Sequence, residues 1–255
     1  VTAREDHVSQ VGSSVSAAGN VALSAGKDLD IIASRVTATD EAYLYAGNDL
    51  NVASAQNTDY SYYSKTKKGS FGKTRSRMTE SDRAGVTSSS IQAGSDATLV
   101  AARDINVTGS AVVTDKGGLS VLAGNDVNLG AAQSNFYSAS AKSKSGGLGL
   151  STTSKIKKDA SAETVLVGAT LSGNTSTVQA GHDVVVSASN VISTENTNIH
   201  ARNDIKVESA AEGFSSQHSQ STKKSGLLST GGIGVTLGTS KNTVTQASDG
   251  QTQKG

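Results

Sequence analysis

The sequence predicts an all-β protein: a right-handed parallel β-helix (β-solenoid) with coils of about 21 residues and inserted Lys/Gly-rich excursions that resemble β-hairpins. Three observations lead to this prediction. The amino-acid composition suits strands, one short motif recurs along the chain, and three long insertions interrupt the recurrence at the same point.

The composition favours many thin layers of strands over a thick globular core. The 255-residue chain has no Pro, no Cys and no Trp, and 4% of its residues are aromatic. Pro cannot donate a hydrogen bond to a sheet, so its absence fits a backbone that is mostly paired. The absence of Cys excludes a disulfide framework and thiolate metal sites. No apolar run reaches the roughly 18 residues of a membrane-spanning helix, and there is no leader at Val1, so we expect a segment internal to a longer protein.

A corner motif recurs six times. In each copy an Ala stands three residues before an Asp, and aliphatic residues stand one and three residues after it, as in AGNDLNV at 46–52 and AGNDVNL at 123–129. Weaker copies surround Asn20, Asp96 and Thr175, so that equivalent corners recur every 21 or 22 residues. The six strong corners are at Asp28, Asp49, Asp104, Asp126, Asp183 and Asp204.

The period of this repeat identifies the architecture. Alternating apolar residues on both sides of a polar corner predict short strands with one inward face. A period near 21 is too short for a propeller blade, and the alternation excludes helical repeats. Stacked coils then pair at about 4.8 Å. This register places Leu23 on Leu44, Ala25 on Ala46, Leu29 on Leu50 and Ile31 on Val52.

Three basic excursions interrupt the coils at 59–83, 134–163 and 213–245. They hold 15 of the 23 Lys and Arg residues, 5 of the 22 acidic residues, and seven of the nine aromatic residues. In GGIGVTLGT, the alternation of Ile233 and Leu237 with Gly and Thr predicts an amphipathic hairpin arm, although irregular extra coils remain the alternative. The chain, 1–255, is predicted to be a single β-solenoid fragment of a longer array, with approximate modules 11–85, 86–164 and 165–255, the last one truncated.

Basic, aromatic-tipped arms predict contact with an anionic surface such as lipid headgroups or lipopolysaccharide. Insertion of the arms into a membrane is an alternative that the dyad pattern leaves open. The candidate membrane or envelope contacts are Tyr62, Tyr63, Lys65, Lys67, Lys68, Phe71, Lys73, Lys142, Lys144, Lys155, Lys157, Lys158, Lys223 and Lys224.

The corner Asp residues are predicted to form turns. Each carboxylate is expected to accept hydrogen bonds from backbone N–H groups just downstream, as in an Asx-turn. A calcium site is the alternative, because AGNDLNV is faintly similar to the nonapeptides of calcium-binding β-rolls. Those sites require tandem glycine-aspartate repeats every nine residues, and here each 21-residue coil has one Asp.

No residue pattern predicts catalysis. The acidic residues outside the corners form no repeated cluster, and the four histidines are isolated. His182 stands at a corner where other copies have Lys, Asn or Arg, so we expect it to face solvent. The Lys content comes without a recognisable nucleic-acid-binding module. We therefore expect no enzyme activity, no catalytic residue, no metal, no cofactor and no nucleic-acid partner.

The corner repeat, followed by KKSGLL…GGIGVTLGTSK, resembles the haemagglutinin repeats of filamentous-haemagglutinin-type exoproteins of two-partner secretion systems. The basic inserts are similar to the second haemagglutinin-repeat region of contact-dependent growth inhibition toxin-delivery proteins. The resemblance implies a non-enzymatic segment of a secreted filament on the bacterial cell surface, exported through an outer-membrane secretion partner. It implies that this segment engages the target cell's outer membrane or lipopolysaccharide and aids delivery of a C-terminal toxin. A passive adhesin stalk is the alternative.

Overall fold

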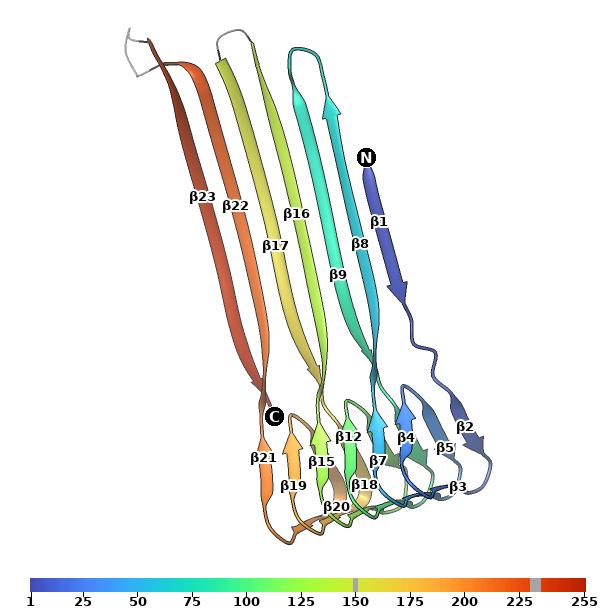
Figure 1. Cartoon of the computed structure of the whole chain (residues 1–255). Helices are drawn as coiled ribbons and strands as arrows, with labels where there is room; N and C mark the ends of the chain where they lie inside the picture. The colour runs from blue at the N-terminus through green and yellow to red at the C-terminus, as the bar shows by residue number, and fades with distance from the viewer. Residues whose placement is uncertain (149–150, 230–234) are drawn as a thin grey trace.

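The computed structural model describes residues 1–148, 151–229 and 235–255, and these consist of strands and short connections without a helix (Figure 1). Most short strands form two parallel sheets, which together we call the stack. The long strands form one antiparallel sheet, which we call the hairpin sheet and which projects from the stack. The protein is thus all-β, as the sequence predicts.

Six layers make up the stack, each contributing strands to both parallel sheets. One sheet has the order β4-β7-β12-β15-β19-β21, and the other contains two ladders that merge at β18 and β20. The six-stranded sheet comprises β4 (Leu29–Ile32), β7 (Leu50–Ala53), β12 (Ile105–Thr108), β15 (Val127–Gly130), β19 (Val184–Ser187) and β21 (Ile205–Glu208). The ten-stranded sheet comprises β2 (Ser14–Ala17), β3 (Val21–Ala25), β5 (Arg35–Ala38), β6 (Ala42–Ala46), β10 (Ser90–Ala93), β11 (Ala97–Ala101), β13 (Ala111–Thr114), β14 (Leu119–Ala123), β18 (Thr170–Ala180) and β20 (Asn190–Ala201).

The register of the stack follows the corner repeat. Leu23 pairs with Leu44, and Leu29 pairs with Leu50, each 21 residues further along the chain. Where a long insertion intervenes, the pairing continues with the residue that the repeat makes equivalent, so that Leu44 pairs with Leu99 across 55 residues. The insertions therefore leave the cross-section of the stack unchanged.

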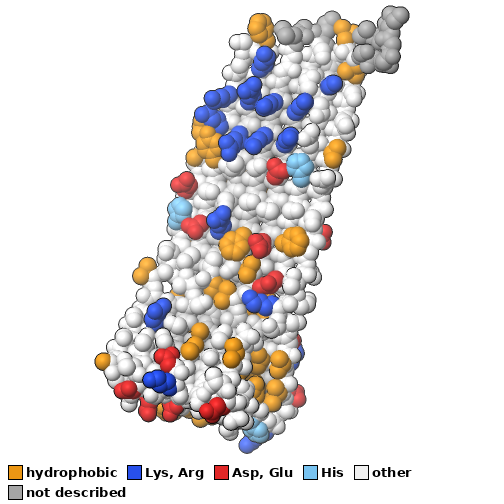
Figure 2. Space-filling model, turned by 180° about the vertical axis from the view of Figure 1, so that it is seen from behind, with side chains coloured by type: hydrophobic (Ala, Val, Ile, Leu, Met, Phe, Trp, Pro, Cys, Tyr) orange, Lys and Arg blue, Asp and Glu red, His pale blue; other side chains and the backbone are white. Residues whose placement is uncertain are grey.

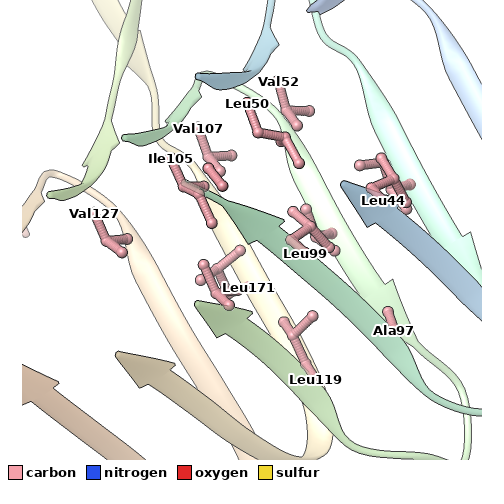
Figure 3. Close-up of a cluster of buried hydrophobic side chains, with 14 of the residues drawn as sticks. Leu44, Leu50, Val52, Ala97, Leu99, Ile105, Val107, Leu119, Val127 and Leu171 are labelled. Carbon is pink, nitrogen blue, oxygen red and sulfur yellow. The ribbon is translucent and has the colours of Figure 1, made fainter. Parts of the chain in front are cut away.

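Inward-facing aliphatic side chains fill the stack from end to end (Figure 3). Leu44, Leu50, Leu99 and Ile105 have no exposed surface, because each is covered by equivalent residues of the layers on both sides. At the last layer the prediction of inward burial is wrong. Ile205 is 49% exposed and Val207 72% exposed, since β21 has a pairing partner on one side only among the described residues.

The three insertions are long antiparallel hairpins that leave the stack after every second layer (Figure 1). Their paired strands extend beyond the boundaries expected from charge. Residues Ile233 and Gly234, part of the alternation on which the hairpin prediction rested, lie outside the described residues. The hairpins are β8 (Ala55–Lys68) with β9 (Thr74–Thr87), β16 (Ala132–Leu148) with β17 (Ser151–Val167), and β22 (Ala210–Ser229) with β23 (Val235–Lys254), and β1 (Thr2–Val8) pairs with β8.

Neighbouring hairpins pair edge to edge into one sheet. Its order is β1-β8-β9-β16-β17-β22-β23, so β9 pairs with β16 and β17 pairs with β22. The spacing explains this continuity. Two layers of the stack rise by about 9.6 Å, and the two strands of a hairpin are also about 9.6 Å wide. One hairpin per two layers therefore fills the width available to it.

The hairpin sheet is a single layer with two accessible faces. Among its described residues only Ser134 and Leu166 are buried, and both lie near the stack. The described residues contain no helix that is long and apolar enough to cross a membrane. Because no second layer covers the sheet, the chemistry of each face is available to a partner.

Candidate binding surface on the hairpin sheet

Eight cations lie on one face of the hairpin sheet in two rows that cross four strands. Successive residues of a strand point to opposite faces, so residues two apart share a face. The paired registers connect each row from β8 through β9 and β16 to β17. The first row is Lys65, Arg77, Lys142 and Lys157, and the second is Lys67, Arg75, Lys144 and Lys155. We call these the basic rows and their side of the sheet the basic face.

The basic rows concentrate like charge without internal compensation. All eight side chains are exposed except Lys65, which is half-buried. None of the eight forms an ion pair with another described residue. Like charges directly opposite each other in a sheet are destabilising. An anion bound across the rows would relieve this repulsion.

The cations gather in the part of the sheet away from the stack (Figure 2). A shallow hollow there is lined by Tyr63 together with cations of both rows from β8, β9 and β16. Beyond the rows, the Lys73 side chain lies over Gly146 of the next hairpin, where a Cβ would approach its Cγ to 2.9 Å. The hollow and this contact bring cations of two separate insertions together.

The predicted contact residues divide between the two faces. Tyr63, Lys65, Lys67, Lys142, Lys144, Lys155, Lys157 and Lys224 lie on the basic face by register, whereas Tyr62, Lys68, Lys158 and Lys223 lie on the opposite face. Phe71 is in the turn between β8 and β9 and is 76% exposed. The candidate residues therefore do not form one surface.

The sequence analysis missed Arg75 and Arg77, which complete the rows on β9. A signal for them was present. The four strands of the rows carry the tripeptides KTK, RSR, KSK and KIK at 65–67, 75–77, 142–144 and 155–157. In a strand, two cations separated by one residue point to the same side. Counting charge per insertion, without regard to alternation, hid this pattern.

Closer to the stack, the basic face changes character. Asp159 is next to His218, whose ring lowers the pKa of the Asp159 carboxyl through a hydrogen bond. Beyond them, a row of six cross-strand serines crosses the three hairpins, and then Phe136 and Phe214 flank Glu163. The serines are Ser61, Ser81, Ser138, Ser161, Ser216 and Ser248. Among the described residues of the basic face, the acidic groups thus lie between the basic rows and the stack.

Apolar side chains are exposed on the other side of the rows, toward the hairpin ends. Phe71 has φ 59° in its turn, and Gly72 follows it with φ 68°. On the third hairpin Leu227 pairs with Leu237, and these are 44% and 77% exposed. From the hairpin ends toward the stack, the sheet therefore presents apolar groups, then cations, then hydroxyls, then mixed charge.

The corner Asp residues have a different role from the one expected. Asp28 Oδ1 accepts a hydrogen bond from the backbone N–H of Asp49, 21 residues later, at 3.2 Å. The same contact joins Asp104 to Asp126 at 3.1 Å and Asp183 to Asp204 at 2.9 Å. The Asx-turn prediction is wrong in its partner, because the N–H belongs to the next layer and not to the same corner. Stacking places that N–H directly beside the carboxylate.

Cations strengthen two of these corner contacts. Arg103 Nε donates to Asp49 Oδ1 at 2.7 Å, and this bond lowers the pKa of the Asp49 carboxyl. At the corresponding corner His182 Nδ1 is 3.2 Å from Asp126 and 3.1 Å from Asp183, with its side chain 55% exposed. The solvent-facing position expected for His182 is confirmed. These three groups could surround a metal ion, but His182 occupies the register position of Arg103 and replaces it as the charge partner.

Known proteins match this chain through its repeats. The profile of the hemagglutinin repeat matches residues 2–74, 69–177 and 150–255, which covers nearly the whole chain. The chain belongs to the hemagglutinin-repeat family. No solved structure matches it significantly.

Hemagglutinin-repeat relatives of the chain are named as toxins. It is 41% identical over 143 residues to the tRNA nuclease CdiA of Escherichia coli strain STEC_O31, covering 55% of this chain and 4% of that protein. It is 30% identical over 162 residues to the tRNA nuclease CdiA-2 of Burkholderia pseudomallei strain 1026b, covering 63% of this chain and 5% of that protein. It is 30% identical over 246 residues to the deoxyribonuclease CdiA of Dickeya dadantii strain 3937, covering 95% of this chain and 7% of that protein.

The hemagglutinin-repeat chain therefore spans less than a tenth of the length of these relatives. It is a segment of a secreted, CdiA-like filamentous-haemagglutinin protein, of a kind that is exposed at the cell surface after export through the outer membrane.

Proposed function

We propose that this chain is a non-enzymatic segment of a toxin-delivery filament, and that its hairpin sheet engages the outer membrane of a target cell and aids delivery of a C-terminal toxin. The stack, which we interpret as a right-handed parallel β-helix with coils of about 21 residues, holds the hairpins in register. The secretion partner would be an outer-membrane protein that exports the parent chain. The observation that carries the proposal is the pair of basic rows on an otherwise uncovered sheet.

Charge and position support contact with an envelope. Outer surfaces rich in phosphorylated lipid are anionic and attract clustered Lys and Arg, by about 1 kcal/mol for each residue near the surface. The rows lie about 10 to 12 residues along β8 from its start near the stack, which corresponds to roughly 35 Å of extended strand. The hairpins can therefore reach a surface that the stack does not touch.

Replacing Lys142, Lys144, Lys155 and Lys157 by Gln in the full-length parent protein tests the proposal. We expect normal surface display and receptor-dependent attachment, with toxin entry reduced at least tenfold. The matched control replaces four exposed cations of the stack and its corners by Gln, namely Lys27, Arg35, Lys116 and Arg202. It should deliver toxin as the unmodified protein does.

Unchanged toxin entry in the hairpin variant, with normal display, would reject the delivery function. The chain would then be a passive adhesin stalk, the alternative that the length of the stack and the family's name favour. In that case, shortening the array should reduce the reach of cell-cell or host adhesion without any dependence on the basic rows.

A further inference from the structure

We infer that the basic rows form a phosphate-binding band, and that the hairpin sheet meets phosphorylated lipid headgroups with its ends directed toward the membrane. This inference rests on the proposed function and specifies its ligand, residues and orientation. It concerns eight residues on one face: four from β8 and β9, and four from β16 and β17.

The geometry of the rows suits several phosphate groups at one level. The four strands of each row are about 4.8 Å apart, and the two rows are separated by about 7 Å along the strands. The eight charges therefore occupy a patch of roughly 15 by 7 Å that runs across the hairpins. Lys and Arg both bind phosphate, and Arg75 and Arg77 add planar groups that can donate two hydrogen bonds to one phosphate. Multiple phosphates in one plane would neutralise neighbouring cations together.

The order of chemistry along the strands indicates the orientation. Phe71, Leu227 and Leu237 are exposed beyond the rows, toward the hairpin ends. The acidic residues of the basic face, including Asp159 and Glu163, lie on the side of the stack. A sheet lying flat on the membrane would press these carboxylates against anionic headgroups. With the hairpin ends leading, the apolar groups meet the acyl boundary, the cations meet the phosphates, and the acids stay in water.

The opposite face carries weaker and discontinuous charge. Lys158 has Ser219 as its cross-strand partner on β22 and Ala141 on β16. Lys223 faces Lys241 on the third hairpin and has Ser154 on its other side. No row of that face has four consecutive cations in the registers of the described residues. The two faces therefore differ in a way that substitutions can separate.

Vesicle binding by the 255-residue chain tests the band. The probe is phosphatidylcholine vesicles containing phosphatidic acid, with vesicles of phosphatidylcholine alone for comparison. Each cation near an anionic surface contributes about a fivefold factor, so Gln at Lys142, Lys144, Lys155 and Lys157 should weaken binding by two to three orders of magnitude. Arg at the same four positions should retain binding. The control with Gln at Lys27, Arg35, Lys116 and Arg202 removes equal charge and should lose less than about threefold.

Equal loss in the two Gln variants would overturn the band, because net charge alone would then explain binding. Unchanged binding by the hairpin variant would also overturn it. So would binding of soluble inorganic polyphosphate without binding of the vesicles, because a soluble polyanion would then be the ligand. Thermal unfolding of each variant checks folding, and the Gln variant should be no less stable, since it removes like-charge repulsion.

Tryptophan reporters test the orientation, since the chain contains no Trp. Phe71→Trp places a reporter at a hairpin end, and Phe214→Trp places one on the basic face near the stack. Vesicles with brominated acyl chains should quench the emission of the first strongly and leave the second nearly unchanged. Comparable quenching of both would show a flat sheet and overturn the orientation.

The inference and the proposed function can fail separately. If the Gln variant loses vesicle binding but still delivers toxin, the band is real and the delivery function is wrong. If it binds vesicles normally but fails to deliver toxin, the delivery function survives and the phosphate band is wrong.

Discussion

The Oδ1 atom of Asp104 accepts the backbone N–H of Asp126 at 3.1 Å, although the two residues are 22 positions apart. The same Oδ1 accepts a hydrogen bond from the side-chain amide of Asn125 at 2.8 Å. Each strong corner thus connects to the corner of the next layer. A side chain that the sequence repeats because every layer has the same turn also joins the layers together.

Asp104→Ala should lower the free energy of unfolding by about 1 to 3 kcal/mol, because the N–H of Asp126 loses its acceptor in a partly buried position. Asp104→Asn keeps one acceptor oxygen and should lose less. Urea denaturation measures both. The control is Asp40→Ala, an exposed acid, which should stay within about 0.5 kcal/mol of the unmodified protein. A loss no larger for Asp104→Ala than for Asp40→Ala would contradict the role of the ladder.

The Asp49 carboxyl should contribute a pH-dependent part of the stability. The hydrogen bond from Arg103, supported by the N–H of Asp104, lowers the pKa of Asp49 in the folded protein. An acid with a lowered folded pKa stabilises the fold above its unfolded pKa of about 3.9, and this stabilisation is lost as pH falls through the folded pKa.

Arg103→Gln should therefore reduce stability by an amount that is constant above about pH 4 and that shrinks at more acidic pH. Unfolding curves between pH 2 and 7 measure this difference, and carbon NMR of the Asp49 carboxyl measures the pKa directly. If the pKa of Asp49 is the same with and without Arg103, the assigned cause is incorrect.

Leu50 and Val127 should tolerate charge far less well than Lys67. Both aliphatic side chains have no exposed surface, whereas Lys67 lies on the open hairpin sheet. Leu50→Asp and Val127→Asp would bury an unpaired carboxylate and should abolish folding of the stack. Lys67→Asp should be neutral or slightly stabilising, because it breaks a row of like charges.

A milder substitution keeps this comparison measurable. Leu50→Ala should cost about 2 to 5 kcal/mol through lost burial and a cavity, and circular dichroism with urea detects the loss. Equal tolerance of Leu50→Asp and Lys67→Asp would reject the inward assignment of the strand on which the whole register depends.

The stack was predictable because two independent signals coincide in each layer. Aliphatic residues such as Leu50 and Val52 alternate with polar ones, and Asp49 marks the corner just before them. A shift of one residue would turn the aliphatic side chains to the solvent, so the register has one solution. The exposed Ile205 and Val207 show the limit of this reasoning, since the pattern says which face a residue is on and not whether a neighbouring layer covers it.

The joined hairpin sheet was harder to predict, because each insertion alone describes only one hairpin. The pairing of Lys142 with Arg77 depends on contacts between insertions 60 or more residues apart. It could have been anticipated from spacing, since hairpins two strands wide leave a stack every two layers. The basic rows then follow from the KTK, RSR, KSK and KIK tripeptides at 65–67, 75–77, 142–144 and 155–157. The insertions' charge was visible in the sequence, but its division between two faces required the register.

Gly109 should be intolerant of a side chain at the place where a hairpin leaves the stack. It has φ +56°, and an added Cβ would lie 2.4 Å from the Cβ of Ala132, the first residue of β16, and 2.9 Å from Ser54 Oγ. Ala33 and Ala188 adopt similar positive φ values after their own strands, so the backbone conformation alone does not exclude Ala. We therefore expect Gly109→Ala to cost about 1 to 3 kcal/mol through overpacking against the hairpin base, and hydrogen exchange should quicken first near Ala132. Gly26→Ala is the control, because an added Cβ there meets nothing within 4 Å, and its stability should change by less than about 0.5 kcal/mol. Equal effects of the two substitutions would mean that the hairpin base moves freely relative to the stack, contrary to the packing at Gly109.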